Sequence, residues 1–370
     1  MPLVKYAVFH PWKTAAVLVV GVVLGVGAFY VYQVSTAFGA VATEEFDPSE
    51  AREAIDESPV HPEVSPPSTV IDLDLEPTYD LDAELALIEE QRAAVDQGSE
   101  TFNSAAYGRP IDDDLYDTYL LVGTDASGFL ADTIVFALQP GEGGTPALVS
   151  LPRDLFVWNM CKQTFTRLNT GLGGCKGVAS GAELLAIMVE DYTGIPVDHL
   201  ARVDFKGFER VVDTMGGIRV CVDHPRRDLR SHLDLPSTGC QRLDGEDALA
   251  WVRSRHPEEL VNGNWRSVGG SDFGRQERQQ DVLFQMAAKI ATFTSPASLS
   301  RRLSAVASSV RLDSSWSLGD AVVAAWRYRG ITQDEVHRFS IEVDNYRTTY
   351  GQAVLIPSVP FAEQLAEFYD

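Results

Sequence analysis

Three short apolar runs in the middle of the chain constrain its fold more than any other stretch. Each run is rich in β-forming residues: 119–122, 131–138 and 147–151. A polar residue stands at or near one end of each run: Asp125, Asp132 and Arg153. Runs of this length and composition are typical of strands. We therefore predict three adjacent strands that bring two carboxylates and one guanidinium to neighbouring strand ends.

Pro152 marks the end of the third predicted strand. Proline has no N–H to donate to a sheet ladder, so the strand should stop before it and leave Arg153 and Asp154 on the rim. Two carboxylates beside an arginine suit a divalent metal and a phosphate. The rim is therefore a candidate site.

The negative charge of the chain is concentrated in one segment. Residues 41–118 include 22 acidic and three basic residues, which gives −19 of the formal net charge of −23. The rest is nearly balanced, and 45% hydrophobic residues allow a substantial core. An acidic exterior argues against nucleic acid as a partner, because phosphate backbones need a basic surface.

A long uncharged run near the N-terminus predicts a membrane span. Its core, residues 15–32, would reach roughly 27 Å as a helix, about the thickness of the hydrocarbon layer. Lys5 and Lys13 precede it and acidic residues follow, so residues 1–13 are expected to be cytoplasmic and the body extracellular. A cleaved signal peptide is the alternative. The length of the run and Tyr30 and Tyr32 at its end favour an uncleaved, single-pass anchor in the cell membrane over 14–34.

Two segments separate this span from the main domain. Residues 35–78 are acidic and proline-rich, which predicts a disordered linker. Residues 79–112 include Leu81, Leu85 and Ile88 near helical spacing, which predicts an accessory amphipathic helix. Residues 113–370 are expected to form the extracellular domain.

The four cysteines predict two disulfides, since an even number outside the membrane lies in an oxidising compartment. Metal binding would need closer CxxC spacing, which is absent. Three pairings are possible. We favour the two local ones because each closes a loop that contains glycine or proline: Cys161 with Cys175, and Cys221 with Cys240.

The remaining sequence alternates between helical and strand patterns. Helices are predicted over 181–192, 208–215, 272–293, 297–310 and 318–328. A helix or short strand is predicted over 248–255, and strands over 199–205, 218–222, 336–343 and 353–357. Gly216 and Gly217 are typical of a helix C-cap. This alternation predicts an α/β fold, a three-layer α-β-α sandwich with a central mixed sheet.

Two further segments place cations where chemistry could use them. Arg253 and Arg255 would share one face if their segment is extended. In the helix over 272–293, four residues fall on one stripe: Arg275, Gln279, Val282 and Met286. The stripe is polar near the helix N-terminus, which offers donors for an anion, and apolar further on. It would suit a ligand with a charged head and a hydrocarbon tail.

These segments resemble the LytR-CpsA-Psr family of Gram-positive and actinobacterial cell envelopes. The resemblance covers residues 119–290 and rests on seven blocks that occur in the family's order: LLVGTDAS, ADTIVFALQP, VSLPRDLFV, RLN, GIPVDHLARVDFKGFERVVDTMGGIRVCVD, LDGEDALAWVRSR and SDFGRQERQQ.

The resemblance implies a Mg²⁺-dependent phosphotransferase. Such an enzyme moves a glycopolymer from a polyprenyl-pyrophosphate carrier to peptidoglycan. The resemblance also implies that Asp125 and Asp132 are metal ligands and that Asp272 is an acidic residue that acts on the incoming hydroxyl. The pyrophosphate would be bound by a further set: Arg153, Arg253, Arg255, Arg275 and Gln279.

The chain departs from the family at two positions. Ser127 and Leu130 stand where the family has arginines, so two guanidiniums are missing. Residues inserted between Arg255 and Asp272 lengthen a loop beside the site. Arg266 is expected to be a surface arginine on this glycine-rich loop; the alternative is that it replaces a missing charge.

Each implied site residue also has a structural interpretation. Asp125 could cap a turn, and Asp272 could be the N-cap of its helix. Arg253 and Arg255 could pair with Glu246 and Asp247. Arg167 and Asn169 could be loop hydrogen-bonding residues. His199 and His256 show no partner pattern and are expected to be structural.

Two other functions are compatible with the same residues. One is a non-catalytic protein of the same fold that binds a polyprenyl lipid or serves as an envelope scaffold. The other is a hydrolase of polyprenyl pyrophosphate, with water in place of the sugar hydroxyl. Turnover separates the scaffold from the enzymes, and dependence on an acceptor glycan separates the transferase from the hydrolase.

Overall fold

The computed structural model describes residues 42–57, 116–125, 128–140, 144–268, 272–290, 292, 307–315, 333–348 and 351–369. The predicted transmembrane helix (14–34) and accessory helix (79–112) lie outside these ranges and stay predictions. Within the described ranges, no helix is both long enough and apolar enough to cross a bilayer.

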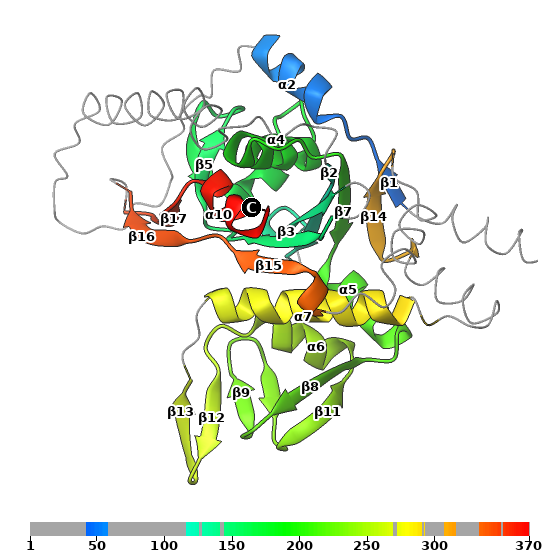
Figure 1. The fold of residues 1–370 in the computed structure, drawn as a ribbon, viewed down its shortest axis with the longest axis vertical. Coiled ribbons are helices and arrows are strands. Elements are labelled where there is room, and N and C mark those ends of the chain that lie inside the picture. The colour runs from blue at the N-terminus through cyan, green and yellow to red at the C-terminus, as the bar shows by residue number, and fades with distance from the viewer. Residues whose placement is uncertain are drawn as a thin grey trace, which may run out of the picture.

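A seven-stranded mixed sheet forms the centre of the molecule, in the order β1-β14-β7-β2-β3-β4-β15 (Figure 1). The strands have these bounds: β1 Ala42–Glu44, β14 Val310–Asp313, β7 His199–Val203, β2 Tyr116–Thr124, β3 Ala131–Pro140, β4 Ala147–Leu151 and β15 His337–Ser340. β2, β3 and β4 pair antiparallel, whereas β7 runs parallel to β2 and β15 parallel to β4. The prediction of three adjacent strands is confirmed, and β4 ends directly before Pro152.

Helices lie on both sides of this sheet (Figure 1). α4 (Gly181–Thr193) and α10 (Phe361–Tyr369) lie on one side, and α5 (Phe205–Thr214), α6 (Gly245–Arg253) and α7 (Asp272–Ile290) on the other. The first core joins Leu120 and Phe136 of the sheet to Leu185 of α4. α4 begins with a capping box between Ser180 and Glu183. The predicted α/β fold with a central mixed sheet is confirmed.

A second core lies beneath α6 and α7, in the lower part of Figure 1. It is covered by two smaller sheets, β8-β11 and β10-β9-β12-β13. Their strands are β8 Ile218–Val222, β9 Arg226–Asp228, β10 Leu233–Leu235, β11 Gly239–Leu243, β12 Glu258–Val261 and β13 Asn264–Ser267. The shorter elements elsewhere are β5 Phe156–Asn159, β6 Thr164–Arg167, η3 Leu168–Gly173, η4 Gln333–Glu335, β16 Val343–Arg347 and β17 Ala353–Pro357.

The inserted segment after Arg255 is a hairpin, so the prediction of a glycine-rich loop is wrong there. β12 and β13 pair antiparallel around Asn262 and Gly263, which both have positive φ, 53° and 77°. An Asn-Gly pair readily adopts this two-residue turn, and the sequence carries that signal. Val310, predicted as the end of a helix, begins strand β14; most of the two helices predicted over 297–310 and 318–328 lies outside the described residues.

The two glycines after α5 form the predicted helix end. Gly216 and Gly217 have φ of +80° and +79°. A Cβ on Gly217 would lie 2.4 Å from the carbonyl oxygen of Leu243. This position therefore needs glycine for two reasons: its positive φ and the lack of room for a side chain.

Both favoured disulfides are present. Cys161 is bonded to Cys175, and Cys221 to Cys240. Cys221 and Cys240 stand directly opposite each other in the β8–β11 pair. The antiparallel register therefore brings the second pair of sulfurs together.

Residues 42–57 correct the predicted linker, because they are ordered and packed on the domain. β1 pairs parallel with β14, and α2 (Pro48–Glu57) lies against α4 (Figure 1). Ala51 and Ile55 are one helical turn apart and are buried in the first core, 5% exposed each. Arg52 donates to Asp191 at 2.6 Å and to Glu190 at 3.1 Å. The acidic composition hid a short amphipathic helix that buries Ala51 and Ile55 against the domain.

We predict that Ile55→Ala destabilises the domain by about 3 kcal/mol, because a buried isoleucine side chain is truncated in a packed core. Urea denaturation of the full chain measures this. Glu53→Ala, on the exposed side of α2, is the matched control and should stay within about 0.5 kcal/mol of wild type. Equal stability of the two variants would contradict the docking of α2.

Candidate functional site

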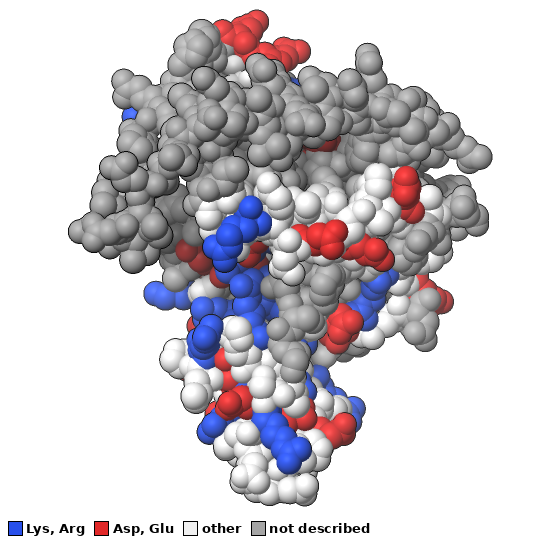
Figure 2. Space-filling view, turned by 90° about the vertical axis from the view of Figure 1, so that its left-hand side faces the viewer, with Lys and Arg blue, Asp and Glu red and all other residues white. Residues whose placement is uncertain are grey.

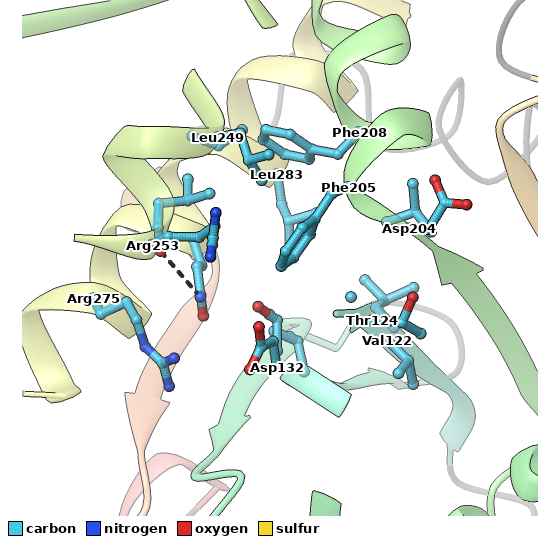
Figure 3. A pocket seen from close by; sticks show the side chains of 18 of the residues that line it. Val122, Thr124, Asp132, Asp204, Phe205, Phe208, Leu249, Arg253, Arg275 and Leu283 are labelled. Atoms are coloured by element: carbon cyan, nitrogen blue, oxygen red, sulfur yellow. Dashed lines mark hydrogen bonds between the residues drawn. The ribbon is translucent and has the colours of Figure 1, made fainter. Parts of the chain in front are cut away.

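A cavity of about 490 Å³ lies between the sheet and the three helices α5, α6 and α7. Figure 3 shows Arg253, Arg275 and Asp132 around one end, and Phe205, Phe208, Leu249 and Leu283 around the other. The lining also includes the polar residues Arg153, Arg255 and Gln279 and the apolar residues Val212, Val282 and Met286. One cavity thus combines a cationic region with an apolar one.

The predicted stripe of α7 lines this cavity along its length. Arg275, Gln279, Val282 and Met286 are all lining residues. Arg275 is only 4% exposed, and the Gln279 side-chain amide donates to the Val252 carbonyl at 3.3 Å. The helix therefore presents its polar residues at one end of the cavity and its apolar residues further in, as the sequence predicts.

The opposite side of α7 is fixed to the sheet through Gln280. Its amide nitrogen donates to Ser150 Oγ at 2.9 Å and to the Leu148 carbonyl at 3.3 Å. Its oxygen accepts from Arg338 Nε at 3.1 Å. Gln280 is 3% exposed, so these bonds lie inside the protein. They hold the helix at a fixed distance from β4 while the neighbouring Gln279 faces the cavity.

Arg278 joins α7 to the end of α6. It donates to the carbonyl oxygens of Trp251, at 3.1 Å, and of Ser254. Burial, reinforced by the nearby Arg226, lowers the pKa of Arg278 to about 10. The guanidinium remains charged at neutral pH and satisfies carbonyls at the helix C-terminus.

Asp132 and Arg153 meet at the strand ends, as the sequence predicts. Arg153 Nη1 donates to Asp132 Oδ1, and both residues line the cavity. The backbone behind Arg153 is held by the Asn169 N–H, which donates to the Arg153 carbonyl at 3.0 Å. Arg167 donates to the Ala353 carbonyl at 2.8 Å. Arg167 and Asn169 thus support the loop, which is the structural interpretation that the sequence allows.

Asp125 caps a turn at the end of β2. Its Oδ1 accepts from the Gly128 N–H at 2.9 Å and the Leu130 N–H at 3.4 Å. Among the described residues, the lining of the cavity includes Asp132 and not Asp125. Asp272 begins α7, but its side chain lies outside what the structure describes. The structure brings together Asp132 and five of the pyrophosphate-binding candidates: Arg153, Arg253, Arg255, Arg275 and Gln279.

Arg253 and Arg255 reach the cavity by a different route from the predicted one. The segment is not extended: Arg253 is the last residue of α6, and Ser254 is its C-cap. The Arg253 guanidinium lies over the Phe205 ring, 4.4 Å from its centroid, a cation–π arrangement that orients it toward the cavity. Arg255 follows the turn and lines the same wall.

Asp228 is a buried residue of the site that sequence reasoning missed. It is 1% exposed and accepts five hydrogen bonds. One oxygen accepts from the N–H groups of Arg230 and Ser231, and the other from the hydroxyl of Ser254 and the N–H groups of Arg255 and His256. The only signal in the sequence was the position of Asp228 itself, shortly before a polar turn of the kind that aspartate caps.

These donors decide the charge state of Asp228. Burial alone would raise its pKa, but the hydrogen bonds from the His256, Arg230 and Arg255 N–H groups and the Ser254 hydroxyl lower that pKa below its usual value. The carboxylate is ionised at neutral pH. It holds two turns together, and both carry cavity-lining residues.

Comparison with known proteins decides the family. The model of the LytR_cpsA_psr family matches residues 88–367. The chain belongs to the LytR_cpsA_psr family. Cell wall biosynthesis protein LcpA of Corynebacterium glutamicum is 31% identical over 212 residues, 50% of this chain and 38% of LcpA. The polyisoprenyl-teichoic acid–peptidoglycan teichoic acid transferase TagU of Bacillus cereus is 26% identical over 52% of this chain and 58% of TagU. The chain thus matches less than two thirds of the length of these relatives.

The fold is that of solved LytR_cpsA_psr structures. A LytR-Csp2A-Psr enzyme from Actinomyces oris is 30% identical, with a TM-score of 0.55 over 69% of this chain and 90% of that one. TagV of Bacillus subtilis shares the fold at 21% identity, with a TM-score of 0.56 over 69% of this chain and 95% of its own.

The structure bears on one of the two family arginines that the chain lacks. Leu130 is 42% exposed at the turn capped by Asp125. Arg266, the suggested replacement, lies on β13 opposite Glu259, is exposed, and is not among the described residues that line the cavity. Arg266 is therefore a surface arginine, as the favoured interpretation predicts, and the alternative that it replaces a missing charge in the site is not supported.

We predict that Asp228→Asn destabilises the protein by about 2 kcal/mol at pH 7, because the amide offers donors to buried N–H groups. Since the folded pKa lies below the usual 3.8, the carboxylate contributes above that pH and its contribution is lost as pH falls through the folded value. Urea denaturation at pH 7, 5 and 3 should therefore show a difference that shrinks only at pH 3. Asp234→Asn, an exposed aspartate on β10, is the control. A difference that is constant from pH 7 to pH 3 would contradict this role.

Proposed function

We propose that this protein is a phosphotransferase that moves a glycopolymer from a polyprenyl-pyrophosphate carrier to peptidoglycan. The observation that carries the proposal is the cavity, which is cationic at one end and apolar at the other. A polyprenyl pyrophosphate has the same division between a charged head and a hydrocarbon tail. Membership of the family and the names of LcpA and TagU support a role in cell wall assembly.

The apolar end of the cavity fits an isoprenoid tail. Phe205 and Phe208 of α5 and Leu283 of α7 line it from two helices. The Arg253 guanidinium over the Phe205 ring marks the place where the apolar end meets the cationic one. Burying such a chain is favourable by about 25 cal/mol per Å² of apolar surface. The tail would fix the position of the pyrophosphate relative to the arginines.

The cationic end supplies charge where the reaction needs it. The acceptor hydroxyl attacks the phosphorus that bears the sugar, the bond to the bridging oxygen breaks, and polyprenyl monophosphate leaves. Arg153, Arg253 and Arg275 stabilise the negative charge that moves onto the leaving oxygen. Guanidinium groups suit this task because they donate in pairs to phosphate oxygens. Asp272, at the start of α7, is proposed as the group that takes the proton of the hydroxyl.

Mg²⁺ is proposed as the cofactor. No group of three or more metal-binding side chains occurs in the described part of the chain. Mg²⁺ commonly uses one or two carboxylates together with substrate phosphates and water, so Asp132 in the cavity fits as a ligand. Asp125, at the end of the neighbouring strand, is the proposed second ligand. When bound, the ion would neutralise phosphate charge.

The proposed setting is the outer face of the cell membrane, with the N-terminus cytoplasmic. The two disulfides support an oxidising compartment. The lipid carrier would reach the cavity from the bilayer, and peptidoglycan would supply the acceptor.

Arg275→Ala tests the catalytic role of the cationic end. We expect at least a hundredfold loss of turnover, because a preorganised donor to a developing charge is removed. The measurement is the release of polyprenyl monophosphate from a short polyprenyl-pyrophosphate glycan. The assay contains the full chain, Mg²⁺ and a peptidoglycan fragment. Arg266→Ala removes the same charge outside the cavity and should retain wild-type turnover. Retained turnover in Arg275→Ala would sink the assignment, and turnover without any acceptor would favour the hydrolase.

Leu283→Trp tests the tail site separately. The larger side chain fills the apolar end, so the affinity for a C15 or longer pyrophosphate should fall at least tenfold, while that for inorganic pyrophosphate stays within twofold. Ala287→Trp, on the exposed side of α7, is the control. Equal losses for both ligands, or none, would show that the tail does not lie along α7.

A further inference from the structure

The turn that follows β9 brings polar side chains to the cationic end of the cavity. Arg230 and Ser231 both line the cavity, and neither belongs to the stretches singled out by the sequence. Arg230 is exposed, in contrast to the buried Arg275. The turn therefore lies at the mouth, outside the arginines already described. Figure 2 shows the side of the molecule on which Lys and Arg gather between its upper and lower parts.

The position of Arg230 is fixed from two directions. Its N–H donates to Asp228 Oδ1 at 2.9 Å. Its Nη1 lies 2.9 Å from His256 Nε2. Since a guanidinium only donates, the His256 nitrogen is the acceptor in this pair. His256, expected to be structural, orients a cation at the mouth of the cavity.

Ser231 provides a second, independent observation that points to a ligand. The residue is 6% exposed, and its Oγ has no hydrogen-bond partner among the described residues. Buried hydroxyl groups are nearly always hydrogen-bonded. A phosphate oxygen at this wall of the cavity would supply the acceptor.

Asp228 couples this turn to the one that carries Arg255. Its two oxygens accept from the N–H groups of Arg230 and Ser231 on one side and of Arg255 on the other. The two guanidiniums therefore depend on the same buried carboxylate for their placement. Removing it would loosen both turns at once.

We infer that Arg230 and Ser231 form a phosphate subsite at the mouth of the cavity, with Asp228 as the positioning residue. The inference rests on the proposed function and deepens it: the ligand is the outer phosphate of a polyprenyl pyrophosphate, the one that bears the sugar. The tail occupies the apolar end, so the inner phosphate lies by the buried Arg275 and the outer one by the exposed Arg230. This subsite gives the chain a guanidinium in a site that lacks arginines at positions 127 and 130.

Binding of two probes to the full chain in detergent tests the subsite. Arg230→Ala should weaken binding of farnesyl pyrophosphate about tenfold, as expected for a charge-assisted hydrogen bond, and that of farnesyl monophosphate by no more than about twofold. Ser231→Ala should weaken the pyrophosphate about threefold. Arg230→Lys should recover part of the loss. Arg266→Ala, outside the cavity, should leave both affinities within twofold.

A double-mutant cycle tests the role of Asp228. If Asp228 acts through Arg230, the loss caused by Arg230→Ala should fall from about tenfold in wild type to less than threefold in Asp228→Asn. A residue that only stabilised the fold would leave the two losses equal. Circular dichroism at the assay temperature confirms that the variants are folded.

The outcomes separate the subsite from the proposed function. Tenfold loss restricted to the pyrophosphate supports the subsite. Loss in Arg275→Ala without loss in Arg230→Ala overturns the subsite and leaves the proposed function in place. Failure of the wild-type chain to bind farnesyl pyrophosphate overturns both.

Discussion

The site depends on the fixed separation between α7 and the central sheet. Gln280 sets it, because its buried amide bonds to Ser150 and Leu148 of β4 and to Arg338 of β15. On the other side of the helix, Gln279 and Arg275 face the cavity. A buried amide that lost these partners would cost free energy, so the helix cannot move toward or away from the sheet without penalty. These buried hydrogen bonds therefore fix the width of the cavity between α7 and the sheet.

Charge in the site is delivered by segments that are far apart in the chain. Arg153 comes from the end of β4, Arg253 from the end of α6, and Arg275 from the first turns of α7. Arg153 is paired with Asp132, and Arg253 lies over the Phe205 ring. Arg275 lies on the helix that Gln280 joins to β4. Such preorganisation is what phosphoryl transfer needs, since the reaction is accelerated mainly by positioned charge.

The sequence predicted those parts of the molecule that depend on local pattern. The strands that end near Asp125, Asp132 and Arg153, the stripe on α7 and the two disulfides follow from periodicity, proline and cysteine spacing, and the structure contains them. It did not predict parts that depend on distant contacts. α2 is ordered because Ile55 and Arg52 find α4, some 130 residues later in the chain, and its acidic composition alone predicts disorder. Asp228 was missed since its five donors come from two turns that only the fold brings together.

The central claim is that one cavity holds a lipid tail and its pyrophosphate together. A crystal structure of the full chain with farnesyl pyrophosphate tests it most directly. The account predicts the pyrophosphate among Arg153, Arg253 and Arg275, with the tail between α5 and α7 in contact with Phe205 and Leu283. A pyrophosphate bound on another surface, or a tail that points out of the cavity into solvent, would contradict it.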